Sequence, residues 1–243
     1  MEIILMISMV IGLGSFTQGL TGFGLALVSV PLLSLFIDVK LAVPLAGILG
    51  WLVTFPIVWK MRSHIQYKTA LILFIGSLPG SFIGASLLKH LPSEIILIIM
   101  GLILIISGIY SFRSKTSLFK STSPVASAGI GFFSGALGAS VGEPGPPVIA
   151  YTSMLPWTHD QTKSTLVFFF MLQMIGAIIG FWYKGLLTDD VFSYVIKAIP
   201  AFIIGMLLGM FSYQLLHKYN INYHRVIYSL LIIIGFVLIT KSL

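Results

Sequence analysis

Eight apolar stretches constrain the fold of this chain more than any other feature. They occupy residues 2–36, 41–59, 69–88, 94–112, 125–155, 162–183, 191–216 and 221–240. A helix needs about 20 apolar residues to cross the hydrocarbon core of a bilayer, and every stretch provides that length. Inside lipid an unpaired backbone group costs several kcal/mol, so such segments must pair their backbone internally as helices. The sequence therefore predicts an all-α integral membrane protein with about eight membrane segments.

The scarcity of charged residues points in the same direction. Asp, Glu, Lys and Arg make up 9% of the chain, whereas soluble domains carry roughly 25%. The net charge of +7 does not indicate nucleic-acid binding, because the Lys and Arg residues mostly lie at the ends of apolar stretches, as membrane anchors do. With no cysteine, the chain has neither a disulfide framework nor a thiolate metal site. We expect a multi-pass protein of a cell membrane, in the first place the cytoplasmic membrane of a prokaryote, with the lipid bilayer around it.

The order of motifs in the two halves indicates an internal duplication. A basic, polar linker at 113–124 separates a first half, 1–112, from a second half, 125–243. Each half begins with a glycine-interrupted segment and later contains a small-xxx-small helix, Gly80 to Gly84 in one half and Gly205 to Gly209 in the other. Chance similarity between apolar segments is the alternative. We interpret the chain as two four-segment membrane repeats.

Segments 1 and 5 are too long for one simple crossing, and glycine and proline interrupt them. Paired broken segments in two repeats often mark the binding site of a transporter. Glycine lets backbone N–H groups approach a ligand, and a half-helix N-terminus presents unpaired donors to an anion. Pro146 and Pro147 suit the first turn of such a half-helix. We expect an anion site between the two segments, with these candidate substrate-binding residues: Gln18, Gly19, Thr21, Gly22, Ser134, Ser140, Gly142 and Gly145.

Two alternatives stay open for the broken segments. Their glycines also fit a role in close helix packing, as in other small-xxx-small motifs. Each segment either crosses the membrane fully or returns to its own side as a re-entrant hairpin. The distribution of Lys and Arg between the two sides slightly favours hairpins by the positive-inside rule.

Glu143 is the one acidic residue placed well inside a predicted membrane segment. Charge at that depth is costly and usually functional. Its possible roles are a proton carrier or a cation ligand. The structural alternative is a position in a water-accessible re-entrant loop near an interface. Lys163 follows segment 5 and fits either an anion-attracting group at the mouth of the pathway or a snorkelling anchor.

An intramembrane hydrolase is the enzymatic alternative. Residues Gly138-Ala-Ser140-Val-Gly142 match the G-x-S-x-G pattern of a serine nucleophile. Such a serine needs a base within hydrogen-bond reach, yet all histidines fall at predicted segment ends or in loops. No zinc-protease or phosphate-loop motif occurs. We therefore expect no enzyme, no metal and no cofactor.

The broken segments also carry a family resemblance. The stretch Gln18-Gly-Leu-Thr-Gly-Phe-Gly24, running into Val30-Pro-Leu-Leu33, resembles the opening motif of the sulfite exporter TauE/SafE family. Residues 134–142 with Gly145-Pro-Pro147 resemble its second-repeat motif, and 162–165 resemble its F-R-A-T-like stretch, with Lys163 in place of arginine. The resemblance implies a bundle of two membrane repeats that transports small, often sulfur-containing anions. One departure stands out, because Glu143-Pro144-Gly145 replaces the usual Ile-Gly-Gly before the proline pair.

These observations together predict a secondary transporter, and specifically an exporter, of a small anion such as sulfite, a sulfonate or another organic anion. Glu143 is the candidate for proton coupling. A passive anion channel is the main alternative, and the serine hydrolase is a weaker one. The oligomeric state stays open and includes a homo-oligomer.

Overall fold

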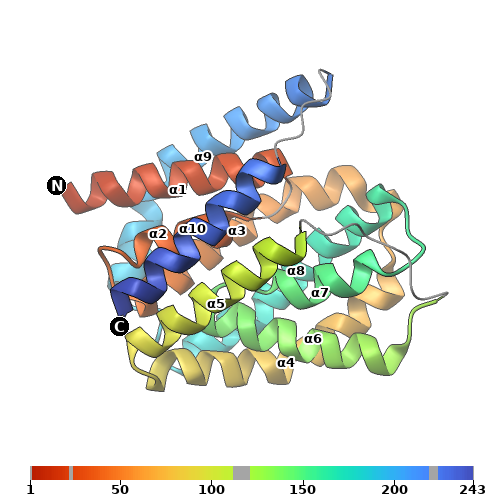
Figure 1. Ribbon diagram of the computed structural model, residues 1–243, viewed down its shortest axis with the longest axis horizontal. Helices are drawn as coiled ribbons and strands as arrows, with labels where there is room; N and C mark the ends of the chain where they lie inside the picture. Colours follow the sequence, from red (N-terminus) through yellow and green to blue (C-terminus); the bar gives the residue numbers. More distant parts are fainter. Residues whose placement is uncertain (1, 22–23, 112–120, 219–223, 243) are drawn as a thin grey trace. The chain divides into compact units, whose positions relative to one another are not determined.

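The computed structural model describes residues 2–21, 24–111, 121–218 and 224–242, and all of its regular elements are helices (Figure 1). They are α1 (Glu2–Thr21), α2 (Leu25–Leu33), α3 (Val39–Met61), the short η1 (Arg62–His64), α4 (Tyr67–His90), α5 (Ser93–Ser111), α6 (Pro124–Val141), α7 (Gly145–Ser153), α8 (His159–Tyr183), α9 (Asp189–Lys218) and α10 (His224–Ser242). The described part of the chain contains no strand, which confirms the predicted all-α class.

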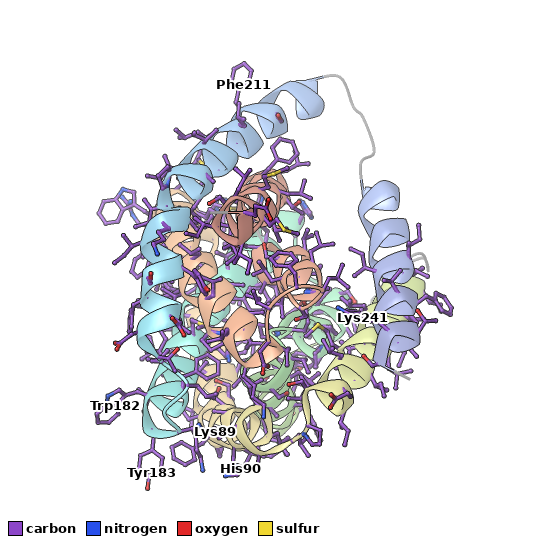
Figure 2. All side chains as sticks on the ribbon, turned by 90° about the vertical axis from the view of Figure 1, so that its left-hand side faces the viewer. Lys89, His90, Trp182, Tyr183, Phe211 and Lys241 are labelled. Carbon is purple, nitrogen blue, oxygen red and sulfur yellow. The ribbon has the colours of Figure 1, made fainter. Side chains whose placement is uncertain are left out.

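The helices have the length and composition of membrane spans. Six of them in the described ranges are long and apolar enough to cross a bilayer, over Glu2–Leu20, Val39–His64, Tyr67–His90, Pro124–Val141, His159–Tyr183 and Asp189–Ser212. Shorter apolar helices cover Ser93–Ile109 and Ile232–Ser242. Large apolar side chains such as Phe211 on α9 and Trp182 on α8 project outward (Figure 2). The chain is thus a multi-pass membrane protein, because outward apolar surface of this extent needs lipid around it.

The chain forms two compact units, and each takes helices from both halves of the sequence. Unit 1 consists of Met1–Val53, Leu91–Arg113 and Leu187–Leu243. Unit 2 consists of Thr54–His90 and Ser114–Leu186. Unit 1 therefore contains α1, α2, most of α3, α5, α9 and α10, whereas unit 2 contains the end of α3, η1, α4, α6, α7 and α8. Each unit is described by itself.

In unit 1, α1 packs directly against α9 through glycine (Figure 1). A Cβ atom on Gly205 would overlap with the carbonyl oxygen of Gly12, and one on Gly209 with that of Phe16. The residue numbers of these contacts increase in the same direction on α1 and on α9, so the two helices are parallel. The missing side chains let the backbones come this close, as small-xxx-small motifs do in membranes.

Also in unit 1, α5 packs antiparallel to α10. A Cβ atom on Gly101 would lie 2.7 Å from Cγ1 of Ile239, and one on Gly235 would lie 2.9 Å from Cγ1 of Ile105. The end of α10 is held near the end of α2, because the Lys241 ammonium donates to the Leu35 carbonyl at 2.5 Å. The last helix before the 113–124 linker and the last helix of the described chain, α5 and α10, therefore run in opposite directions.

In unit 2, α4 runs parallel to α6 and to α8. Cβ atoms on Gly76, Gly80 and Gly84 of α4 would overlap with the backbone of Ala128, Phe132 and Ala136 of α6, in that order. On α8, the Thr165 hydroxyl accepts from the Gln66 N–H (3.0 Å), and Gly180 packs on Ala85. Leu73, Val148, Leu166 and Phe169 form a buried apolar cluster among α4, α7 and α8.

Local signals in the sequence explain where the helices of unit 2 begin. Ser123 caps α6, which has Pro124 in its first turn, and the Ser123 hydroxyl accepts from the Ala126 N–H. Thr158 and Gln161 form a reciprocal capping box at the start of α8. At the far ends of α4 and α8, Lys89, His90, Trp182 and Tyr183 gather together (Figure 2). Amphipathic and basic side chains in such a group are typical of a membrane–water interface.

Candidate functional site

Two helical hairpins occupy equivalent places in the two halves of the chain. A single offset of 120 residues relates Thr21 to Val141 (the ends of α1 and α6), Leu25 to Gly145 (the starts of α2 and α7) and Val39 to His159 (the starts of α3 and α8). We call α1–α2 the first hairpin, in unit 1, and α6–α7 the second hairpin, in unit 2. Their turns correspond to the two segments that the sequence predicts to be broken.

In both hairpins the short helix returns along the long one. In the first, the Ser29 hydroxyl donates to the Val10 carbonyl at 3.3 Å, and Leu25 lies against Gly14. In the second hairpin, the Tyr151 and Ser127 hydroxyl oxygens lie 2.9 Å apart. The Ser134 hydroxyl donates to the Pro144 carbonyl. Because later residues of α2 and α7 meet earlier residues of their partners, both pairs are antiparallel.

Gln18 ties the turn of the first hairpin together. Its side-chain oxygen accepts from the Leu25 N–H (3.2 Å), and its side-chain nitrogen donates to the Gly50 carbonyl (3.1 Å). Gly50 is the central residue of α3, so the turn lies level with the middle of that helix. The amide of Gln18, which is 5% exposed, is therefore used to fix backbone atoms at the turn.

The start of α2 presents backbone donors. Gly24 precedes it with φ 110°, a left-handed conformation that favours glycine. Among the described residues, the helical hydrogen-bond pattern of α2 begins with the Val28 N–H donating to the Gly24 carbonyl (3.2 Å). The N-terminus of a helix carries a partial positive charge from the helix dipole.

Three further residues predicted for the first hairpin have different placements. A Cβ atom on Gly19 would lie 2.6 Å from the Met206 carbonyl oxygen, so Gly19 faces α9 in a close helix contact. Thr21 is the last residue of α1, and its side chain lies outside the described residues. Gly22 also lies outside them.

In the second hairpin, the predicted polar groups are largely bonded to backbone atoms nearby. The Ser134 hydroxyl donates to the Pro144 carbonyl, and the Ser140 hydroxyl donates to the Ala136 carbonyl at 2.7 Å. Gly142 ends α6 with φ 79°, and its N–H donates to the Leu137 carbonyl. These bonds fix the turn, and a hydroxyl that donates to a carbonyl keeps only its lone pairs for a ligand.

The start of α7 has few donors. Pro144 precedes the helix, and Pro146 and Pro147 follow Gly145 in the first turn. Proline has no backbone N–H, so Gly145 supplies the one N–H among residues 144–147. A side chain on Gly145 would meet Cδ1 of Ile149 at 3.2 Å and the Phe170 ring at 3.9 Å. This helix start therefore differs sharply from that of α2.

Glu143 lies in the turn of the second hairpin, and it is buried. Its side chain is 2% exposed, and its Oε1 has no hydrogen-bond partner among the described residues. The helices of unit 2 that pack together here carry their other ionisable side chains near their ends, apart from one tyrosine on α7. These side chains are Tyr67, Lys68, Lys89 and His90 on α4, Tyr151 on α7, and His159, Asp160, Lys163 and Tyr183 on α8. A buried carboxyl with a free oxygen needs a proton or a cation to be stable.

Gln173 belongs to this site and was missed by sequence reasoning. It is 2% exposed, and its side-chain nitrogen donates to the Ser81 hydroxyl at 3.2 Å. A Cβ atom on Gly138 would lie 2.8 Å from that nitrogen, so Gln173 sits directly against α6. An amide in the middle of apolar segment 162–183 was the available signal.

Lys163 lies apart from this group. It is a half-buried residue in the second turn of α8. Ten residues separate it from Gln173, which corresponds to about 15 Å along a helix. The structure therefore brings Ser134, Ser140, Gly142, Glu143 and Gly145 together in unit 2, and it leaves Lys163 nearer to one end of α8.

The described part of the chain thus combines helices long enough to cross a membrane with a buried carboxyl, and ionisable groups inside membrane segments usually mark functional sites. The family model described as sulfite exporter TauE/SafE matches residues 7–238. The chain belongs to this family, which confirms the resemblance seen in the motifs. Its members are membrane exporters, so the protein is a transporter and not a hydrolase.

One curated protein shows a similarity over most of both chains. The chain is 23% identical over 208 residues to the "Probable sulfite/organosulfonate exporter TauE" of Cupriavidus necator, covering 82% of this chain and 80% of the relative. No solved structure matches the chain.

Proposed function

We propose that the protein is a secondary transporter that exports a small anion such as sulfite, a sulfonate or another organic anion. The observation that carries this proposal is the match to the sulfite exporter TauE/SafE family over residues 7–238, and the start of α2, which follows the left-handed Gly24 in a hairpin, is the part of the structure that supports it. Helix starts of this kind bind anions without a buried arginine. The name of the C. necator relative supports the same class of solute.

For the membrane arrangement, we propose eight segments in two repeats, 1–112 and 125–243, joined by the linker 113–124. Segments 1 and 5 are then re-entrant hairpins. Because α6 and α8 both run parallel to α4, the second hairpin returns to the side from which it enters. The antiparallel pair α5 and α10 supports inverted repeats. Nine residues of α2 or α7 rise about 14 Å, roughly half of a 30 Å hydrocarbon core.

In each repeat, the turn of the hairpin then lies near mid-membrane. In the first repeat, Gln18 positions the start of α2, and Thr21 and Gly22 stay candidate binding residues from the sequence. In the second, Ser134, Ser140, Gly142 and Gly145 shape the turn around Glu143. Gly19 acts through its contact with α9. Lys163 attracts anions at the mouth of the pathway, and the protein works in the cytoplasmic membrane of a prokaryote.

We assign proton coupling to Glu143. No other carboxylate, lysine or histidine of α4, α6, α7 or α8 lies near the middle of these helices, so its charge has no nearby partner in the described part of unit 2. Burial without a partner favours the neutral carboxyl, and ionisation must then accompany a change in the surroundings. A proton carried by Glu143 therefore links transport to the pH gradient.

Counterflow in proteoliposomes tests the carrier. Liposomes preloaded with unlabelled sulfite or a sulfonate should accumulate the labelled anion transiently, with saturable rates. Glu143→Gln should keep this exchange and lose acceleration by an imposed pH gradient, whereas Glu94→Gln, an exposed acid in the first turn of α5, should keep both. Linear, unsaturable uptake without counterflow would instead establish a passive channel, and an unchanged pH response of Glu143→Gln would remove the proton role.

A further inference from the structure

The turn of the second hairpin is rich in acceptors and poor in donors. The hydroxyl protons of Ser134 and Ser140 are both given to backbone carbonyls. The N–H groups of Gly142 and Glu143 both point to the Leu137 carbonyl. Three prolines near the start of α7 remove further N–H groups. The donors near this turn include the Gly145 N–H, the Val148 N–H and the second amide hydrogen of Gln173, and all of them are neutral.

The free acceptors at the same turn include a carboxyl group. Glu143 Oε1 is buried and has no partner in the described ranges, and the Ser134 and Ser140 oxygens keep their lone pairs. These neutral donors do not offset an ionised carboxylate for an approaching anion. A group that carries positive charge and N–H donors satisfies this turn, because charge-assisted hydrogen bonds to a carboxylate are roughly twice as strong as neutral ones.

We propose that Glu143 binds a primary ammonium group of the transported solute, so that the protein prefers a zwitterion with an amino group and an oxyanion group. This inference rests on the proposed transport of small anions and names the solute class more narrowly. It follows from the position of Glu143, a buried acid whose Oε1 has no hydrogen-bond partner among the described residues, at this acceptor-rich turn.

The same carboxyl then couples transport to protons by competition. With the ammonium group bound, Glu143 is ionised, and with the solute gone, it takes a proton from the water on the side facing it. When the next solute binds, this proton leaves to the water on the opposite side. A single carboxyl holds either the proton or the ammonium group, so an exported zwitterion is exchanged for an imported proton.

The test compares two solutes of nearly equal size. 2-Aminoethanesulfonate and propane-1-sulfonate share the sulfonate and differ by an ammonium group in place of a methyl group. In counterflow at fixed pH, the native protein should take up the amino compound with about tenfold higher kcat/KM, the loss expected when a charged group is left without its hydrogen bond. Glu143→Gln should reduce this preference to within about twofold while propane-1-sulfonate uptake continues. Glu94→Gln should keep the native preference.

The outcomes separate the two proposals. If the native protein moves propane-1-sulfonate as well as it moves the amino compound, anion transport stands and the ammonium site is refuted. If Glu143→Gln keeps the preference, the site is refuted as well. If neither sulfonate nor sulfite is exchanged by protein that elutes as one folded species, anion transport itself fails. Glu143→Asp, which keeps the charge, should retain part of the preference and so distinguish charge from a folding defect.

Discussion

Gly19 offers a sharp test of how the first hairpin is held in unit 1. Replacing it by alanine places a Cβ atom 2.6 Å from the Met206 carbonyl oxygen, 3.0 Å from the Met210 nitrogen and 3.1 Å from the Gly209 Cα. All three atoms belong to the backbone of α9, so no side chain can rotate away. To reach ordinary contact at 3.4 Å, α1 and α9 must separate by about 0.8 Å.

The size of the effect follows from this separation. Inserting a methyl group into a packed helix contact costs about 1–3 kcal/mol, which outweighs the 0.5–1 kcal/mol that alanine gains over glycine within a helix. For a chain of this length, about 1 kcal/mol corresponds to a shift of roughly 2–4 °C in Tm. The net cost is about 0.5–2 kcal/mol, so we expect Gly19→Ala to lower the melting temperature by about 1–8 °C.

Gly12→Ala is the matched control, because it makes the same change on the same helix against the same partner. Its Cβ atom would lie 3.5 Å from the Ala201 carbonyl oxygen, which is ordinary contact. Thermal unfolding of both variants in one detergent, at one scan rate and followed by size-exclusion chromatography, gives the comparison. Equal melting temperatures would refute the packing argument. Lost transport by Gly19→Ala at the native melting temperature would instead assign Gly19 to the substrate.

Three further substitutions, at two residues, test the polar groups at the hairpin turns. Gln18→Leu leaves the Leu25 N–H and the Gly50 carbonyl without their partner. It should lower the free energy of unfolding by about 2–4 kcal/mol, measured as a drop in Tm, and weaken anion exchange. A native Tm would contradict this role of Gln18. Gln173→Leu should lower the free energy of unfolding by about 1–3 kcal/mol, because the buried Ser81 hydroxyl loses its donor. Gln173→Glu should change the solute preference in counterflow. Identical behaviour of both variants would contradict a place for Gln173 at the turn.

The sequence predicts the helices well because their signals are local. Apolar length correctly indicates helices throughout, and six of those described are long enough to span a membrane. Capping residues such as Ser123 and Thr158 fix where α6 and α8 begin. The left-handed Gly142 similarly fixes the end of α6, since few other residues adopt φ 79°. The family was also recognisable, because its motifs lie at these same turns.

The partners of the polar groups could not be predicted, because they depend on contacts between distant segments. Gln18 is noticeable in the sequence, but its bond to Gly50 requires the position of α3. Gln173 was overlooked for the same reason, since its partner Ser81 lies on α4. The motif also does not show that the Ser134 and Ser140 hydroxyls donate to backbone carbonyls. A pattern of glycine and serine therefore locates a turn without showing which of its atoms remain free.

The pairing of α1 with α9 has a consequence for biosynthesis. Gly12 leaves the ribosome 193 residues before Gly205, the residue that packs on it. At 5–20 residues per second, α1 waits for roughly 10–40 s before its partner exists. During that time the face of α1 that later packs on α9 has no partner helix, so lipid or a chaperone must cover it. Truncated chains that end before α9 should therefore be preferred targets of membrane quality control, and co-expressed α9–α10 fragments should protect them.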